Sequence, residues 1–180
     1  DVYFSATIDG EITKISPSAL KLFKLKSLKE IEGKNVKEYY YNSTDKERFN
    51  EIIFKKGEIN NFETILKDNE GNKIYIEENS HIVYDDSNKP IKIEGILRDI
   101  TKRKKTQKII EEQHKEILSS ITYAKRIQNA LMPSEIFFKN YLPQHFIIFF
   151  PKNIVSGDFY WMKQVHDIVF FAAADCTGHG

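Results

Sequence analysis

The chain has almost no cysteine: Cys176 is the only one in 180 residues, so no disulfide can form within the chain. Long apolar runs are missing too, because residues 146–150 and 168–174 fall far short of the ~20 residues of a membrane-spanning helix. Neither sign of charge dominates, since 27 basic residues face 26 acidic ones. This balance favours neither a nucleic acid nor a membrane surface as partner. We therefore expect a cytoplasmic globular protein that binds no nucleic acid.

An initiator methionine and a signal peptide are also missing, and the chain opens inside a strand-like stretch. We expect an excerpt of a longer protein, attached to a membrane only if an upstream segment supplies the anchor. The local excess of charge at residues 102–105, Lys-Arg-Lys-Lys, is typical of a solvated helix start, with a lipid or nucleic-acid contact as the alternative.

Residues 1–101 predict an α+β unit. Strands are expected at residues 2–8 and 11–15, on either side of an Asp9-Gly10 turn. Short helices follow: Ser16 is the expected N-cap of the first, the second ends at Gly33, and Ser43 or Thr44 is the expected cap of the third. Three further strands are expected at residues 59–67, 73–84 and 91–100.

This order of elements resembles the PAS domain family. The matching residues are the Asp9-Gly10 turn, Ser-Pro-Ser-Ala at 16–19 with Leu22-Phe23, Ile-Glu-Gly-Lys at 31–34, and the ending Gly-Ile-Leu-Arg-Asp-Ile-Thr at 95–101. The resemblance implies a five-stranded antiparallel sheet with short helices, a sensory role, and a helix that leaves after the last strand.

The interior of such a domain can hold a ligand. Flavin photosensors of this fold bond the flavin through a cysteine of the helical region, and residues 1–101 contain none. Haem needs an axial ligand such as histidine, and His81, the sole histidine of this region, stands in a strand whose alternation points it outward. We expect neither cofactor, and instead an empty packed core or a small metabolite. Four aromatic residues are expected in the core: Phe4, Phe23, Phe49 and Phe62.

Residues 102–132 contain no glycine or proline and predict one long helix. An apolar position recurs every seven residues, while the companion positions are mostly polar; the two sets are Ile110, Ile117, Ala124 and Leu131, and Gln107, His114, Ile121 and Gln128. This pattern predicts a marginal two-stranded coiled coil, so we expect a homodimer through the PAS domain and this helix. A single amphipathic helix packed on its own domain is the alternative.

Residues 133–180 are richer in aromatic residues, and they predict a buried strand at 147–150 and a hairpin of strands at 158–163 and 168–174. A turn centred on His166-Asp167 places Asp158 directly opposite Asp175, where side chains share a face with Cβ atoms ~4.5–5.5 Å apart. Two ionised carboxylates repel there, and apolar surroundings increase the cost. Mg²⁺ or Mn²⁺ relieves the repulsion, with the backbone carbonyl of Cys176 as a further ligand. Solvated turn-forming aspartates are the alternative.

Residues 133–180 do not have, at the required spacing, the partner residues that a nucleophilic cysteine or a zinc site would need. Cys176 has no base placed to make it a nucleophile, and His179 has no second histidine or cysteine at the spacing of a zinc site. Gly157, Gly178 and Gly180 would let the backbone approach a metal or a phosphate closely.

The same segment resembles the opening of the SpoIIE-like branch of the protein phosphatase 2C family. The matching residues are Pro151 with Val-Ser-Gly-Asp-Phe-Tyr-Trp at 155–161, Ala-Asp-Cys-Thr-Gly-His-Gly at 174–180, and the helical stretch 120–133. The resemblance implies that residues 133–180 begin a truncated phosphatase α/β sandwich. It further implies that Asp158 and Asp175 bind two Mn²⁺ or Mg²⁺ ions, whose shared water attacks phosphoserine or phosphothreonine. Further acidic ligands are expected downstream, so this fragment is expected to be inactive alone.

The expected organisation is a PAS sensor at 1–101, a signalling helix at 102–132 and the phosphatase fragment at 133–180. The expected function is regulated dephosphorylation of a phosphoprotein, with no catalytic residue assigned. The alternative is a dimerisation and protein-binding module with a degenerate phosphatase-like domain. A histidine kinase with His114 as phosphoacceptor is a third reading, although residues 111–116 lack the Arg and Pro usual after such a histidine.

Overall fold

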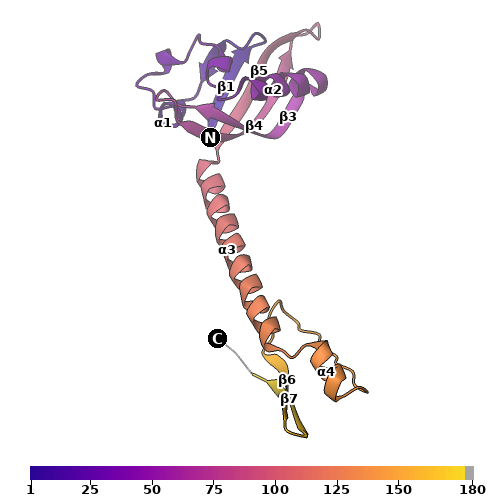
Figure 1. Cartoon of the computed structure of the whole chain (residues 1–180). Helices are drawn as coiled ribbons and strands as arrows, with labels where there is room; N and C mark the ends of the chain where they lie inside the picture. The colour runs from indigo at the N-terminus through magenta and orange to yellow at the C-terminus, as the bar shows by residue number, and fades with distance from the viewer. Residues whose placement is uncertain (177–180) are drawn as a thin grey trace. The chain divides into compact units, whose positions relative to one another are not determined.

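The computed structural model describes residues 1–176 and divides into two compact units. The N-terminal unit is Asp1–Lys108, and the C-terminal unit starts at Ile109. The long helix α3, Thr101–Leu131, begins in the first unit and continues into the second (Figure 1).

The N-terminal unit is built on an antiparallel sheet of five strands in the order β2-β1-β5-β4-β3. The strands are β1 Val2–Thr7, β2 Ile12–Ile15, β3 Glu58–Lys67, β4 Lys73–Tyr84 and β5 Pro90–Asp99. Each of the five strands predicted within residues 1–101 is present with its ends shifted by one residue at most, which confirms the α+β prediction for this unit. The strands were predictable because apolar residues alternate along them and Gly, Asn and Asp mark the turns.

The segment between β2 and β3 carries α1 Ala19–Leu22, two short 3₁₀ helices, η1 Leu28–Glu30 and η2 Val36–Glu38, and α2 Ser43–Lys56. The predicted caps were wrong. Ser18, not Ser16, is the N-cap of α1, because the Ser16 hydroxyl accepts a hydrogen bond from the Tyr3 backbone N–H instead (3.0 Å). Asn42 is the N-cap of α2, and Ser43 is already the first residue of that helix.

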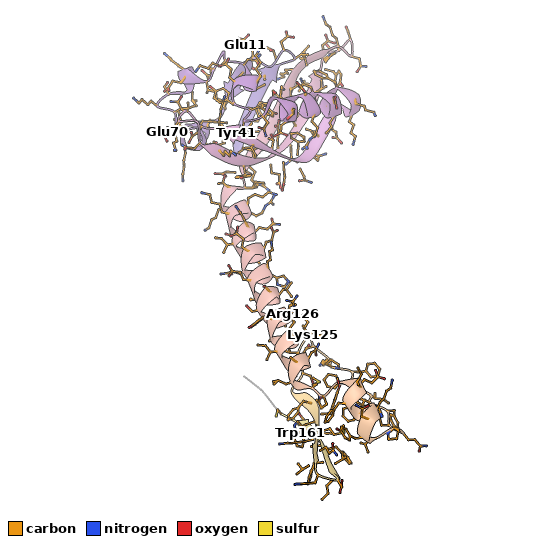
Figure 2. The ribbon with its side chains drawn as sticks, viewed as in Figure 1. Glu11, Tyr41, Glu70, Lys125, Arg126 and Trp161 are labelled. Atoms are coloured by element: carbon orange, nitrogen blue, oxygen red, sulfur yellow. The ribbon has the colours of Figure 1, made fainter. Side chains whose placement is uncertain are left out.

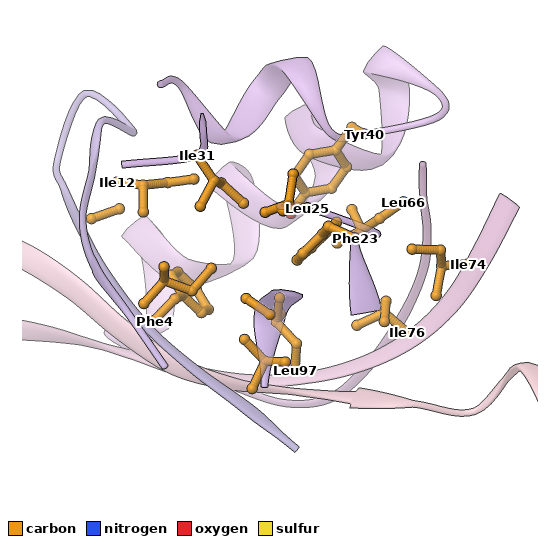
Figure 3. Close-up of a cluster of buried hydrophobic side chains, with 14 residues drawn as sticks. Phe4, Ile12, Phe23, Leu25, Ile31, Tyr40, Leu66, Ile74, Ile76 and Leu97 are labelled. Atoms are coloured by element: carbon orange, nitrogen blue, oxygen red, sulfur yellow. The ribbon is translucent and has the colours of Figure 1, made fainter. Parts of the chain in front are cut away.

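The core lies between the inner face of the sheet and these helices (Figure 3). One cluster joins the sheet to α1 and the segments around the 3₁₀ helices, and includes Phe4, Phe23, Ile31, Leu66 and Leu97. A second cluster joins α2 to the other end of the sheet through Phe49, Ile53, Ile59, Phe62, Ile82 and Ile93. The four phenylalanines expected in the core are all buried.

Gly95 of β5 lies where no side chain fits. A Cβ at this position would be 2.1 Å from Oγ of Ser80 and 2.7 Å from the backbone oxygen of Asn79. The neighbouring strand β4 pairs here directly, since Ser80 is the partner of Gly95 in the sheet. The glycine therefore allows a polar residue of β4 to face inward at this point.

The C-terminal unit contains the rest of α3, α4 Glu135–Tyr141, and the hairpin of β6 Asp158–Val165 and β7 Ile168–Asp175. The α3 helix was predicted to within one residue, and no residue of it is buried in the part of the chain that the structure describes. Its side chains, among them Lys125 and Arg126, stand away from the helix (Figure 2). None of the described helices has both the length and the apolar composition needed to cross a membrane.

Aromatic residues connect α4 to the hairpin. Phe138 of α4 is buried and stacks on His145 (ring centroids 5.4 Å apart) and edge-on against Tyr160 of β6 (5.7 Å). Trp161, the chain's single tryptophan, follows on β6 opposite Ala172 and is partly exposed (Figure 2).

The strand predicted at residues 147–150 was wrong. The structure has no regular element there; Phe146, just before this stretch, is 85% exposed, and Phe150, its last residue, is 90% exposed. A strand needs a hydrogen-bonding neighbour, and the sheet of the C-terminal unit consists of β6 and β7 only, within the described residues.

Replacing Gly95 by alanine tests the close pairing of β4 and β5. Because the new Cβ would overlap Ser80 and the Asn79 backbone, we expect a loss of about 1–3 kcal/mol in the free energy of unfolding, measured by urea denaturation. Ile96→Ala, at the exposed neighbouring position, is the control and should cost only about 0.5 kcal/mol. Equal losses for the two variants would contradict the proposed overlap.

Candidate functional site

A cavity lies inside the N-terminal unit, between the sheet and the helices. Apolar side chains form most of its wall, and the polar side chains of Tyr40, Lys46 and Glu78 also line it. Its volume of about 40 Å³ gives room for a few water molecules or one compact organic molecule. Pockets for drug-sized ligands have volumes of roughly 300–1,000 Å³, so this conformation admits only smaller ligands.

Glu78 reaches the cavity because it occupies an inward position of β4. The alternation of this strand buries Ile74, Ile76, Glu78, Ser80 and Ile82. The Ser80 hydroxyl donates a hydrogen bond to Oε1 of Glu78 (2.7 Å), and the Tyr40 hydroxyl lies 3.5 Å from Oε2. Complete burial raises the pKa of Glu78 to about 7, although Ser80, Lys46 and Tyr40 stabilise the charged form. Glu78 is therefore an acid that titrates near neutral pH.

Lys46 approaches the same cavity from α2. Its Nζ lies 4.6 Å from the ring centre of Phe49 and 5.7 Å from that of Tyr40. Burial lowers the pKa of this ammonium group, while the charge of Glu78 acts in the opposite direction. Within the part of the chain that the structure describes, neither a hydrogen bond nor an ion pair within 4.0 Å reaches Nζ of Lys46. The ammonium group and the carboxyl group thus share one cavity without direct contact.

Sequence reasoning missed this cluster. The available signal was the acid at an inward position of an alternating strand, Glu78 between Ile76 and Ile82. Tyr40 and Lys46 gave no such signal, because folding brings them from another part of the chain. His81 is exposed, as the alternation of β4 predicted.

Polar contacts attach the first turn of α3 to the sheet. The Thr101 N–H donates to Oδ1 of Asp99 (2.8 Å), and the Thr101 hydroxyl accepts from the Tyr75 N–H (3.1 Å). Arg103 pairs with Glu63 of β3 (2.9 Å) and with Glu77 of β4 (3.0 Å). Two members of the basic run 102–105 therefore pair with the sheet, since Lys104 also contacts Glu63. The hydrogen bond from Lys104 lowers the pKa of Glu63.

The hairpin has the predicted register. Asp158 is the direct partner of Asp175, and the turn at 166–167 has His166 in the left-handed region (φ 55°). Both aspartates are exposed, so the burial cost expected for them does not arise in the described residues. Their metal-binding role stays a prediction. No group of three His, Cys, Asp or Glu side chains that could hold a metal occurs among residues 1–176.

Gly157 and Cys176 form the next pair beyond the two aspartates. The Cys176 N–H donates to the Gly157 carbonyl (3.1 Å), and a Cβ on Gly157 would lie 2.2 Å from the Cys176 oxygen. Glycine is therefore needed at 157 for this contact. The predicted roles of Gly178, His179 and Gly180 lie outside the described residues.

The substitution Glu78→Gln tests whether the buried carboxyl group makes stability depend on pH. The pKa of Glu78 is about 7 in the folded protein and 4.5 in the unfolded chain, so between these values the folded state keeps a proton that the unfolded state has lost. Relative to Glu78→Gln, the wild type should lose about 3 kcal/mol of stability from pH 4.5 to 7, with no further change above pH 7. Urea denaturation at pH 4–8 measures this. Glu58→Gln, at an exposed position of β3, should show no such trend, and a flat profile for Glu78→Gln would contradict the prediction.

Comparison with solved structures shows that the N-terminal unit has the fold of a PAS domain. The PAS domain of a protein from Colwellia psychrerythraea matches with a TM-score of 0.50 and 20% identity, over 56% of this chain and 86% of that one. A light-oxygen-voltage domain studied with a flavin analogue matches with a TM-score of 0.50 and 12% identity, over 63% and 87%. An RNA-binding light-oxygen-voltage receptor matches with a TM-score of 0.53 and 13% identity, over 63% and 33%.

These identities establish a shared fold and do not transfer a ligand. None of the curated proteins compared with the chain matches it. The family model described as PAS domain matches residues 1–102, which is more than half of the chain. This match shows that the chain belongs to the PAS domain family, and the five-stranded antiparallel sheet with its inner cavity agrees with it.

Proposed function

We propose that the chain belongs to a signal-transduction protein in which the PAS domain regulates a metal-dependent phosphoserine or phosphothreonine phosphatase through α3. The observation that carries this proposal is that α3 is anchored at both ends. Its first turn is ion-paired to strands β3 and β4, and its last turns are hydrogen-bonded to the segment that leads into Asp158.

The first anchor connects the helix to the strand that carries the cavity acid. Arg103 contacts Glu77, and Glu77 is the neighbour of Glu78 on the opposite face of β4. A shift of β4 that accompanies a change at Glu78 therefore acts on the ion pairs of α3. The pair of Arg103 with Glu63 is exposed on both sides, and such pairs contribute about 0–1 kcal/mol each, so this part of the anchor can break and re-form without unfolding the domain.

The second anchor lies at Gln128. Its side chain exchanges two hydrogen bonds with the backbone of Ser156, and the Asp158 N–H donates to the Ser156 hydroxyl (3.0 Å). A rotation of α3 that displaces Gln128 would pull on Ser156 and on the first residue of β6. Gln128 is also one of the polar companion positions that the heptad pattern places in the predicted coiled-coil seam.

The two aspartates fit part of a metal site. Their shared register supplies two carboxylates on one face, and the Cys176 carbonyl is the further ligand that the sequence suggests. A divalent ion bound here would lower the pKa of a coordinated water and neutralise phosphate charge. The chain's own contribution is to hold the carboxylates opposite one another, with Gly157 permitting the close approach of Cys176.

A protein-binding hairpin is the second candidate function. Ile168, Phe170 and Phe171 of β7 are exposed. In this alternative the hairpin holds a partner protein and the aspartates are solvated surface residues. Metal binding by the aspartates distinguishes the two candidates.

Pairing of two α3 helices completes the proposal. Ile110, Ile117 and Leu131 of the predicted seam are exposed in the single chain, which leaves them free to contact a second copy. Four heptads with polar companion positions give a weak coiled coil, which suits a helix that changes its twist.

Cysteine cross-linking tests the pairing of α3. In a Cys176→Ser background, Ile117→Cys should form a disulfide between two chains rapidly, because the seam brings the two copies of this position together. Ser119→Cys, which lies on the opposite side of the helix, is the control and should cross-link at least about tenfold more slowly. Equal rates at the two positions would argue against the dimer. Adding Glu63→Gln, which removes a partner of Arg103 and Lys104, should change the rate at 117 if the sheet controls the helix.

Manganese binding tests the hairpin. Paramagnetic Mn²⁺ should broaden the NMR signals of residues around 158 and 175, and Asp158→Asn or Asp175→Asn should remove most of this broadening because half of the carboxylate pair is lost. Asp167→Asn, at the turn of the same hairpin, is the control and should leave the broadening intact. Broadening that persists in both Asn variants would favour the protein-binding alternative.

A further inference from the structure

The two charged groups of the PAS cavity differ in how well they are satisfied. Both oxygens of the Glu78 carboxyl face hydroxyl groups, of Ser80 and Tyr40. The Lys46 ammonium, by contrast, lies over two aromatic rings and has no hydrogen-bond acceptor or ion-pair partner within 4.0 Å among the described residues. A partly buried ammonium group that lacks an acceptor is the group most in need of a ligand, and the ligand that suits it is an anion.

We propose that the cavity binds a short-chain organic monocarboxylate, whose carboxylate pairs with Lys46 and whose alkyl chain lies against the apolar wall. This inference rests on the sensory role proposed above, because such a ligand would be the stimulus. Phe4, Phe23, Leu66 and Leu97 supply the wall, which an alkyl chain contacts favourably and a fully polar anion does not. The small volume restricts the chain to a few carbon atoms.

Glu78 makes binding depend on proton uptake. Only a protonated Glu78 leaves the cavity with one positive charge, which the bound carboxylate then neutralises. An ionised Glu78 would repel the ligand across an apolar space where charges are weakly screened. The side chains that act on Glu78 are Ser80 of β4, Lys46 of α2 and Tyr40 of the preceding segment, and Asp45 of α2 acts in turn on Tyr40. The residues paired with Glu78 in β3 and β5 are apolar, Phe62 and Leu97.

A ligand of the opposite charge fits less well. A small ammonium ion would pair with Glu78 only by displacing the hydroxyls of Ser80 and Tyr40, and Lys46 would repel it. A neutral amide would leave the positive charge of Lys46 without compensation. The arrangement therefore discriminates by charge, with shape limiting only the size of the ligand.

Isothermal titration calorimetry on the whole chain tests the proposal with three probes of one size: butyrate, butyramide and butylamine. Butyrate should bind at pH 6, and its affinity should fall about tenfold per pH unit above pH 7 as Glu78 ionises. Butyramide and butylamine should bind at least about tenfold more weakly than butyrate, which corresponds to a single missing charge pair.

Three variants assign the effect to residues. Lys46→Met should abolish butyrate binding, whereas Lys55→Met, on an exposed turn of the same helix, should leave it unchanged. Glu78→Gln should bind butyrate with an affinity that no longer depends on pH between 6 and 8. Circular dichroism of each variant confirms that the sheet is intact before binding is scored.

The proposal is overturned if butyramide or butylamine binds as tightly as butyrate, if Lys46→Met binds like the wild type, or if the folded chain binds no butyrate at pH 6. The sensory role has its own readout, the cross-linking rate at position 117. Butyrate binding that leaves this rate unchanged would support the ligand site and count against signalling through α3. A missing heat of binding would reject the ligand whatever the cross-linking shows.

Discussion

The N-terminal unit depends on keeping one acid inside an apolar core. Glu78 projects inward from β4 because the period of a strand leaves no other direction for that position. An ionised carboxyl in such surroundings is costly unless it is hydrogen-bonded or protonated. The fold meets this demand with Ser80 on the same strand and Tyr40 from across the cavity, and Tyr40 is itself held by its bridge to Leu66 of β3. The remaining cost raises the pKa, so the group responds to pH and to any charge that enters the cavity.

In the proposed function, α3 is the element that carries a change in this core to the C-terminal unit. Because α3 contains no glycine or proline, nothing in its sequence introduces a kink between the two anchors, and we expect a change at Arg103 to reach Gln128 as rotation or translation instead of local unfolding. The anchors differ in kind. The first consists of ion pairs whose Arg103 and Lys104 side chains reach solvent, so that salt weakens them, and the second of paired amide hydrogen bonds, which salt affects less. Ionic strength should therefore act on the sheet end of the helix first.

Local patterns predicted the sheet, the long helix and the hairpin register, because each follows from a period or from a turn next to it in sequence. The two-residue turn at His166-Asp167 was enough to place Asp158 opposite Asp175. The cavity cluster was not predictable in this way, since Lys46 and Glu78 are brought together only by the packing of α2 on the sheet. The wrong strand at 147–150 has a similar cause. An apolar run favours a strand, but the strand forms only where a neighbouring strand can hydrogen-bond to it, and the local sequence does not reveal that neighbour. The Ser16 cap failed because a tertiary contact, the Tyr3 N–H, took the hydroxyl of Ser16.

Trp161 gives the two units separate optical signals. It is the only tryptophan of the chain and stands on β6, whereas the PAS domain holds tyrosine and phenylalanine as its only chromophores of this kind. Light absorbed at the red edge of the indole band therefore excites the hairpin alone. Emission from this residue, followed during denaturation or after a stimulus at the cavity, would show directly whether the hairpin senses an event that began in the other unit.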